Sequence, residues 1–172
     1  MEAHGGYLSW LTPGHSSELV RLARQALEED GQRSQDCALA ISRLPGQRLV
    51  RFSFDSPHTY GRRGALWYRE HHALARLLSA TLDGRVHAYA IDPEEFEQVS
   101  SYAGGRCVGG ERLRYDDVDS PAEDADVEAF DRAQAVWPLA QLGKILGVTR
   151  AEIVQLARAP TVLLELDEAY RG

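Results

Sequence analysis

The sequence predicts an α+β fold: an antiparallel or mixed sheet of four to five strands with two packed helices, followed by a helical C-terminal part. Three observations support this prediction. Short segments with apolar residues at every second position indicate strands, two longer segments with helical apolar spacing indicate helices, and helix-capping signals dominate from residue 120 onward. With 172 residues, of which 44% are hydrophobic and 26% charged, the chain is long enough to bury a continuous core.

The first half of the chain begins with a short apolar opening at residues 7–10 and a turn at Pro13-Gly14. A helix then starts at Ser16 or Ser17 and stops at Gly31. Its predicted buried face consists of Leu19, Leu22, Ala23, Ala26 and Leu27. The segments 37–42 and 48–54, separated by Pro45-Gly46, are expected to form a β-hairpin, and 55–64 a surface loop.

In the middle of the chain, the spacing of apolar residues predicts a second helix near 68–82, which Gly84 stops, and a strand over 85–91. The acidic segment that begins at Asp92-Pro93 is expected to form a turn or a short helix. Glycine pairs at 104–105 and 109–110 predict a tight hairpin or a bulge before a strand over 111–115.

The sequence changes character at Ser120, which divides the chain into an α+β body (1–119) and a helical region (120–172). Whether the second part packs into the first is left open. Ser120-Pro121 with Glu123 caps a helix whose apolar spacing includes Val127 and Phe130 and which ends at 137–138. Helices are predicted over 139–146 and 150–158, and 161–166 is a strand or a last buried turn.

Residues 138–159 resemble the helix-turn-helix motif of bacterial DNA-binding proteins. Gly143 stands where the two helices approach and Gly147 lies in the turn, while Thr149 and Glu152 form a capping box. The resemblance implies a second helix that faces the DNA groove, with base or phosphate contacts from Lys144, Thr149, Arg150, Gln155 and Arg158. The alternative is a helical hairpin that serves packing alone, which the net charge of −7 favours.

An acidic run from Asp116 to Asp131 contains no Lys or Arg. Its acids are Asp116, Asp117, Asp119, Glu123, Asp124, Asp126, Glu128 and Asp131. It is either a solvated linker leading into a helix N-terminus or a docking surface for a basic partner. Tyr60 and Trp67, set among arginines, are the aromatic candidates for partner contact, unless they are buried against the sheet.

The sequence predicts no catalytic site, metal or cofactor. The motifs expected for a serine nucleophile, a phosphate-binding loop, a zinc protease and an EF-hand are missing. His58, His71 and His72 are adjacent or near neighbours without metal-ligand spacing, and His87 is expected to be half-buried in a strand. Cys37 and Cys107 lack a CxxC pattern, which favours two reduced thiols and a cytoplasmic location. Neither a membrane segment nor a secretion signal is expected.

These observations favour a non-catalytic, acidic, protein-binding module of the bacterial cytoplasm, most concretely an immunity protein or adaptor for a basic partner. The bacterial origin is inferred from the basic residues, which are all Arg except for Lys144. The alternative is a DNA-binding transcriptional regulator that uses residues 139–158, for which a homodimer is expected. An enzyme with an unfamiliar site is the third hypothesis.

Overall fold

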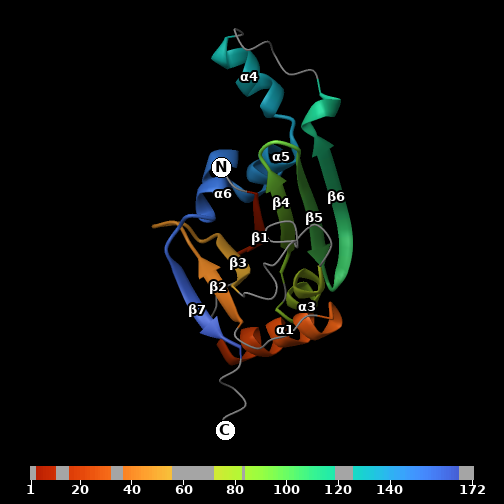
Figure 1. The fold of residues 1–172 in the computed structure, drawn as a ribbon, viewed down its shortest axis with the longest axis vertical. Helices are drawn as coiled ribbons and strands as arrows, with labels where there is room; N and C mark the ends of the chain where they lie inside the picture. Colours follow the sequence, from red (N-terminus) through yellow and green to blue (C-terminus); the bar gives the residue numbers. More distant parts are fainter. Residues whose placement is uncertain are drawn as a thin grey trace.

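The computed structural model describes residues 3–10, 16–31, 37–55, 72–82, 84–118 and 126–166. Its centre is an antiparallel seven-stranded sheet with the order β6-β5-β4-β1-β3-β2-β7 (Figure 1). The strands are β1 (His4–Ser9), β2 (Ala38–Ser42), β3 (Val50–Asp55), β4 (Val86–Asp92), β5 (Phe96–Ala103), β6 (Arg106–Arg114) and β7 (Thr161–Glu165). The described helices are α1 (Ser16–Glu29), α3 (Ala73–Thr81), the 3-10 turn η2 (Tyr115–Asp117), α4 (Val127–Gln134), α5 (Pro138–Leu146) and α6 (Arg150–Leu156).

The α+β class is confirmed, but the sheet has more strands than the four to five predicted. The segment expected as a short apolar opening is β1, the central strand between β3 and β4. Glycine is unfavourable in strands, so Gly5 and Gly6 conceal the pattern in the sequence. The fold leaves no room for a side chain at Gly6, because a Cβ there would lie 2.9 Å from Nε of Arg51 and from the carbonyl oxygen of Phe52.

The segment after Asp92 is also a correction, since only residues 93–95 form a turn and β5 begins at Phe96. Phe96 and Glu97 are both fully buried, and they point to opposite faces of the sheet. Because a buried acid follows a buried apolar residue, the segment has a polar composition, and its sequence does not show the alternation that predicts a strand. The glycine pair at 104–105 has positive φ at both residues and joins β5 to β6, which confirms a hairpin, with a register shift at Ser101/Tyr102. The second pair, 109–110, lies inside β6, so the strand predicted over 111–115 begins earlier, at Arg106.

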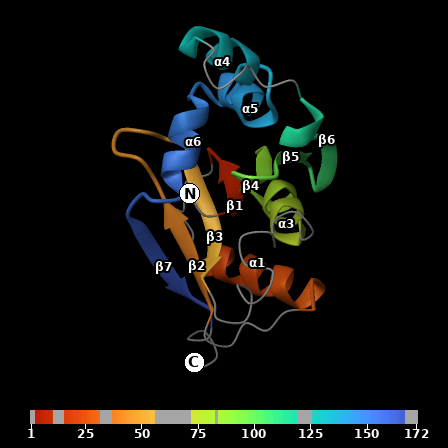
Figure 2. The same ribbon diagram turned by 45° about the horizontal axis from the view of Figure 1, so that its top comes forward.

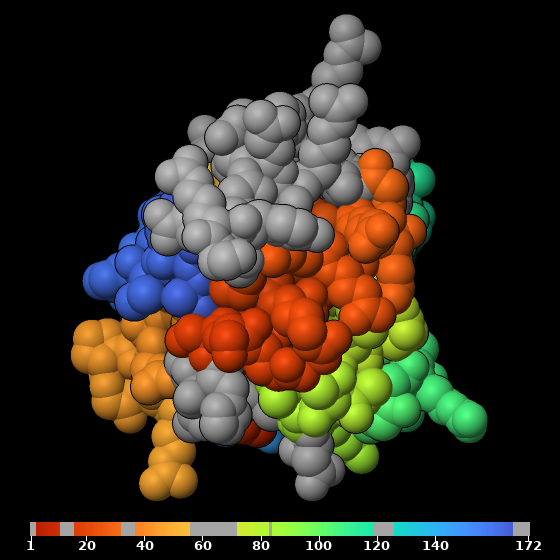
Figure 3. Space-filling model, turned by 90° about the horizontal axis from the view of Figure 1, so that it is seen from below, coloured from red at the N-terminus to blue at the C-terminus, as the bar shows by residue number. Residues whose placement is uncertain are grey.

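The first face of the sheet is covered by α1 and α3, which pack side by side (Figures 1 and 3). All five residues of the predicted face of α1 are buried there, together with strand residues such as Tyr7, Phe52 and Phe54. The second predicted helix is described from Ala73, and the predicted residues 68–71 lie outside the described ranges. Helical apolar spacing therefore predicted this layer correctly.

The second face carries α5 and α6, so the sheet lies between two helical layers. Leu139, Leu142 and Leu146 of α5 and Ile153 and Leu156 of α6 are buried in one cluster with sheet residues Leu8, Leu49, Tyr89, Ile91 and Val99. The chain then returns as β7, which pairs with β2. The strand alternative for 161–166 is thus correct, and the last part of the helical region belongs to the same sheet as the first part of the chain.

The turn between α5 and α6 follows the predicted geometry closely. Gly147 is left-handed with φ 70°, and Thr149 and Glu152 form the predicted capping box. Gly143 is required by close approach, since a Cβ there would lie 2.5 Å from the carbonyl oxygen of Val148. The turn can approach α5 this closely only because residue 143 has no side chain.

Helix α4 differs from the prediction in its surroundings. Its N-cap is Asp126, whose side chain accepts a hydrogen bond from the N–H of Glu128, and the predicted cap at 120–123 lies outside the described residues. None of the residues of α4, all of which the structure describes, is buried. Val127 is 73% exposed and Phe130 41% exposed, so the predicted apolar face points partly into solvent.

We predict that Gly143→Ala lowers the free energy of unfolding by about 2 kcal/mol. A clash with backbone costs about 3 kcal/mol at the upper end of overpacking effects, and the gain in helix propensity of about 1 kcal/mol offsets only part of it. Urea unfolding monitored by circular dichroism measures the difference. Gly109→Ala is the matched control, because no heavy atom lies within 4 Å of a Cβ there. Equal stability of the two variants would contradict the close contact.

Candidate functional site

The candidate site is built around a buried carboxylate, that of Glu97 on β5. The pleat of β5 directs Glu97 and Val99 toward the layer formed by α5 and α6, while Phe96 faces the opposite core. The side chain of Glu97 is 0% exposed. A carboxylate in this position requires a counter-charge and hydrogen-bond donors, because removing an ion from water costs several kcal/mol.

Three residues satisfy Glu97. Nε and Nη2 of Arg150 donate to Oε2 at 3.0 and 2.7 Å, and the hydroxyl of Tyr115 donates to the same oxygen at 3.2 Å. The backbone N–H of Leu139, in the first turn of α5, donates to Oε1 at 2.9 Å. Since a helix N-terminus favours negative charge, the carboxylate fixes both the start of α5 and the start of α6.

Three aromatic rings lie next to this ion pair and contact one another. The ring centroids of Tyr115 and Trp137 are 5.1 Å apart, and those of Phe130 and Trp137 are 6.1 Å apart with an edge-on orientation. The guanidinium carbon of Arg150 lies 5.7 Å from the centroid of Trp137. Burial, followed by the charge of Glu97, raises the pKa of Tyr115 above its usual value, so the phenol stays protonated and remains a donor.

A pocket of about 350 Å³ opens beside this cluster, between α4, η2 and the β4–β5 turn. It is lined by Ile91, Pro93, Glu94, Tyr115, Phe130, Gln134, Trp137 and Arg150. The turn and η2 are tied together, since the N–H of Tyr115 donates to the carbonyl oxygen of Glu95 at 3.0 Å. The lining is mostly apolar with a few polar groups, which is typical of ligand pockets.

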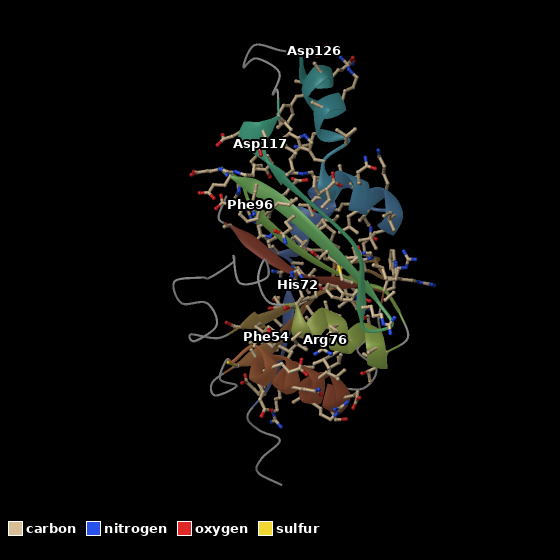
Figure 4. All side chains as sticks on the ribbon, turned by 90° about the vertical axis from the view of Figure 1, so that its right-hand side faces the viewer. Phe54, His72, Arg76, Phe96, Asp117 and Asp126 are labelled. Atoms are coloured by element: carbon tan, nitrogen blue, oxygen red, sulfur yellow. The ribbon has the colours of Figure 1, made fainter. Side chains whose placement is uncertain are left out.

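Acidic residues border the pocket. Glu94 belongs to its lining, and the neighbouring Glu95, Asp116 and Asp117 are exposed. Figure 4 shows Asp117 and Asp126 at the same end of the molecule, beyond the end of the sheet that carries Phe96. We call this region the acidic end and define it by Glu94, Glu95, Asp116, Asp117, Asp126, Glu128 and Asp131.

The structure describes only part of the two predicted sets of binding residues. Of the partner-contact candidates, Asp116 and Asp117 lie at the acidic end, whereas Asp119, Glu123, Asp124, Tyr60 and Trp67 lie outside the described residues. Of the nucleic-acid candidates, Gln155 and Arg158 are exposed and Thr149 caps α6. Lys144 donates to the carbonyl oxygen of Ala135 at 3.2 Å, and Arg150 is bound to Glu97.

Sequence reasoning missed Glu97, Tyr115, Phe130 and Trp137 as members of one site. The available signal was the position of Glu97, which lies two residues before Val99 and therefore on the same face of the strand as this apolar residue. Trp137 was interpreted only as the residue that ends a helix, although it is 8% exposed and contacts three members of the cluster.

Two histidines lie on or next to the sheet away from this pocket. His87 pairs with Ser101 across β4 and β5 at 2.6 Å, and His4 contacts Tyr89, whose hydroxyl also receives a hydrogen bond from Arg51. Burial, then the charge of Arg85, lowers the pKa of His87 to about 4. Burial, then the charges of Arg51, Arg158 and Arg150, lowers the pKa of His4 to about 4.

The remaining candidates for metal binding are dispersed. His72 is hydrogen-bonded to Tyr102 at 2.6 Å, while His58 and His71 lie outside the described residues. Within the described ranges, no group of three or more His, Cys, Asp and Glu side chains is placed to hold a metal ion.

No helix in the same ranges has the length and apolar character needed to cross a membrane.

No protein-family model matches the chain, and neither a curated protein nor a solved structure shows a significant similarity to it.

We predict that Glu97→Gln lowers the free energy of unfolding by about 3 kcal/mol. The amide still accepts the bond from Leu139 but no longer balances the charge of Arg150. The cost lies at the lower end for a broken buried ion pair, because the side chain of Arg150 keeps 20% exposure. Urea unfolding measures it.

Glu128→Gln is the matched control, since Glu128 forms an exposed i,i+4 pair with Arg132 at 3.6 Å. Its loss should cost less than about 0.5 kcal/mol. A cycle that combines Glu97→Gln with Arg150→Met should give a coupling energy well above that of Glu128 with Arg132. Equal coupling in the two pairs would contradict a structural role for Glu97.

Buried His87 and half-buried His4 should make the protein less stable in mild acid. In the unfolded chain they bind protons near pH 6.5, but in the folded chain only near pH 4. Between these values the unfolded state binds more protons, so the free energy of unfolding falls as pH falls, by at most about 1.4 kcal/mol per pH unit for each histidine. Unfolding curves recorded from pH 7 to 4 should show this dependence of the free energy of unfolding on pH. His87→Gln should reduce the slope by about half. An unchanged slope in the variant would be inconsistent with a neutral His87.

Proposed function

We propose that the chain is a non-catalytic protein-binding module whose acidic end docks a basic partner. The observation that carries the proposal is the exposure of α4. This helix presents Val127 at 73% exposure and Phe130 at 41% beside the acids of the same helix, and Val136 just after it is 66% exposed. Apolar anchors surrounded by charge are the composition of protein-binding surfaces.

The charge at this end supports a basic partner. Most acids of the acidic end are exposed, and their ion pairs are weak, as with Arg114 and Asp116 at 4.0 Å. Uncompensated surface acids raise the association rate of a positively charged protein and add specificity rather than bulk affinity. Figures 1 and 2 both place α4 at the end opposite α1.

The most concrete form of this function is an immunity protein or an adaptor that neutralises or recruits a basic protein in a bacterial cytoplasm. No disulfide joins Cys37 and Cys107, both of which the structure describes, and this fits a reducing compartment. In this role the sheet and its two helical layers serve as a rigid support for the binding end.

The DNA-binding alternative has less support. Arg150, the strongest base-contact candidate, is bound to Glu97, and Lys144 is hydrogen-bonded to Ala135. Lys144, Thr149, Gln155 and Arg158 are exposed, but only Lys144 and Arg158 are cationic, which is a small positive surface for an anionic duplex. A shift assay with wild type and Arg158→Ala tests this alternative, which requires that binding weakens in the variant.

The proposal predicts that the partner is lost on charge reversal at the acidic end. A pull-down from the native host at low salt should retain a stoichiometric basic protein, and rising ionic strength should release it. Replacing Asp116 and Asp117 by Lys should weaken binding by at least about tenfold, as measured by calorimetry with the purified partner.

The matched control replaces Glu28 and Glu165 by Lys, which gives the same change in net charge on exposed residues of α1 and β7. Binding should stay close to wild type in this control. If both double variants lose the partner equally, attraction depends on total charge and the acidic end has no special part in docking. If the protein elutes alone at low salt, the proposal fails.

A further inference from the structure

We infer that the pocket beside Phe130 receives an arginine side chain of the partner. This inference rests on the proposed function, because it specifies what the acidic end recognises. Three kinds of observation point to arginine: the shape and aromatic character of the pocket, the balance of charge in its lining, and a guanidinium group that the chain itself already places against the same aromatic wall.

The pocket has the size and lining for one long planar side chain. Its volume of about 350 Å³ lies at the low end for ligand sites, and three of its residues, Tyr115, Phe130 and Trp137, are aromatic. Phe130 is 41% exposed, so its ring can be contacted from outside. A guanidinium group stacks on aromatic faces, and the aliphatic part of an arginine packs against apolar surface.

The charges around the pocket favour a cation. Arg150 belongs to the lining, but Glu97 accepts two of its N–H bonds, and this ion pair has no net charge. Glu94 is a further acidic residue of the lining, and Asp116 and Asp117 follow Tyr115 directly in the chain. Arg114 lies 4.0 Å from Asp116, so Glu94 and Asp117 remain as acids at the opening, which favours a cation.

The contact between Arg150 and Trp137 shows what the aromatic wall accepts. The guanidinium carbon is 5.7 Å from the ring centroid of Trp137, within the distance for a cation–π interaction. A second guanidinium on the Phe130 side would have the carboxylate of Glu94 and the amide oxygen of Gln134 as acceptors. Lysine fits less well, since its ammonium is compact, strongly hydrated and without a planar face.

The test compares short peptides with evenly spaced arginines, lysines or citrullines in an otherwise identical Gly/Ser sequence. Binding to the full chain is measured by fluorescence anisotropy at low salt. The arginine peptide should bind at least about fivefold more tightly than the lysine peptide, and the citrulline peptide should bind least, because it has the planar group without the charge.

Two pocket variants locate the binding. Phe130→Ala should weaken the arginine peptide by about threefold to tenfold and leave the lysine peptide almost unchanged, whereas Glu94→Gln should weaken both peptides, the arginine peptide more strongly. Ile145→Ala is the control, because Ile145 is 67% exposed on α5 and is not part of the pocket. Glu94 is exposed, so Glu94→Gln should unfold at the same urea concentration as wild type. Phe130 packs against Trp137, so urea unfolding of Phe130→Ala shows whether this variant is still folded under the binding conditions.

The outcomes separate this inference from the proposed function. Equal affinity for arginine and lysine peptides, unaffected by Phe130→Ala but lost when Asp116 and Asp117 are reversed, would overturn the arginine pocket and leave the acidic docking surface intact. If neither peptide binds at low salt, both the pocket and the docking of a basic partner are overturned.

Discussion

The ion pair between Glu97 and Arg150 is the interaction on which the second half of the structure depends. It joins a strand in the middle of the chain to a helix more than fifty residues later, at 2.7 Å and with the carboxylate fully buried. A buried carboxylate without its partners would be strongly unfavourable. The register of α5 and α6 on the sheet is thus determined by charge as well as by the apolar cluster around Leu142 and Ile153.

The same ion pair also determines which parts of the second helical layer stay exposed. Once Arg150 is bound to Glu97, the helical pair α5–α6 is oriented with its apolar residues on the sheet and its turn close to Gly143. Trp137 is held over the guanidinium, and α4 extends beyond the sheet with no buried residue among those described. The pocket and the acidic end are therefore consequences of how the second helical layer is attached, and the binding proposal follows from that attachment.

Local signals in the sequence predicted the elements whose stability is local. The apolar face of α1, the hairpin of β2 and β3, and the capping box at Thr149 depend on neighbours along the chain, and all three are confirmed. The strand β1 could not be predicted, because Gly6 is required only by its contacts with Arg51 and Phe52, which come from a strand more than forty residues later. The pairing of Glu97 with Arg150 could not be predicted either, since the two residues are far apart in the sequence and only the folded chain brings them together.

Amide hydrogen exchange in wild type and Glu97→Gln tests most directly whether this carboxylate holds the second helical layer. The account predicts that protection falls at Leu139 and through residues 137–156 in the variant, because the donor to Oε1 and the counter-ion of Arg150 are both weakened. Protection in α1 and α3, on the opposite face, should stay at the wild-type level. Unchanged protection in α5 and α6, or an equal loss on both faces, would contradict the central role of Glu97.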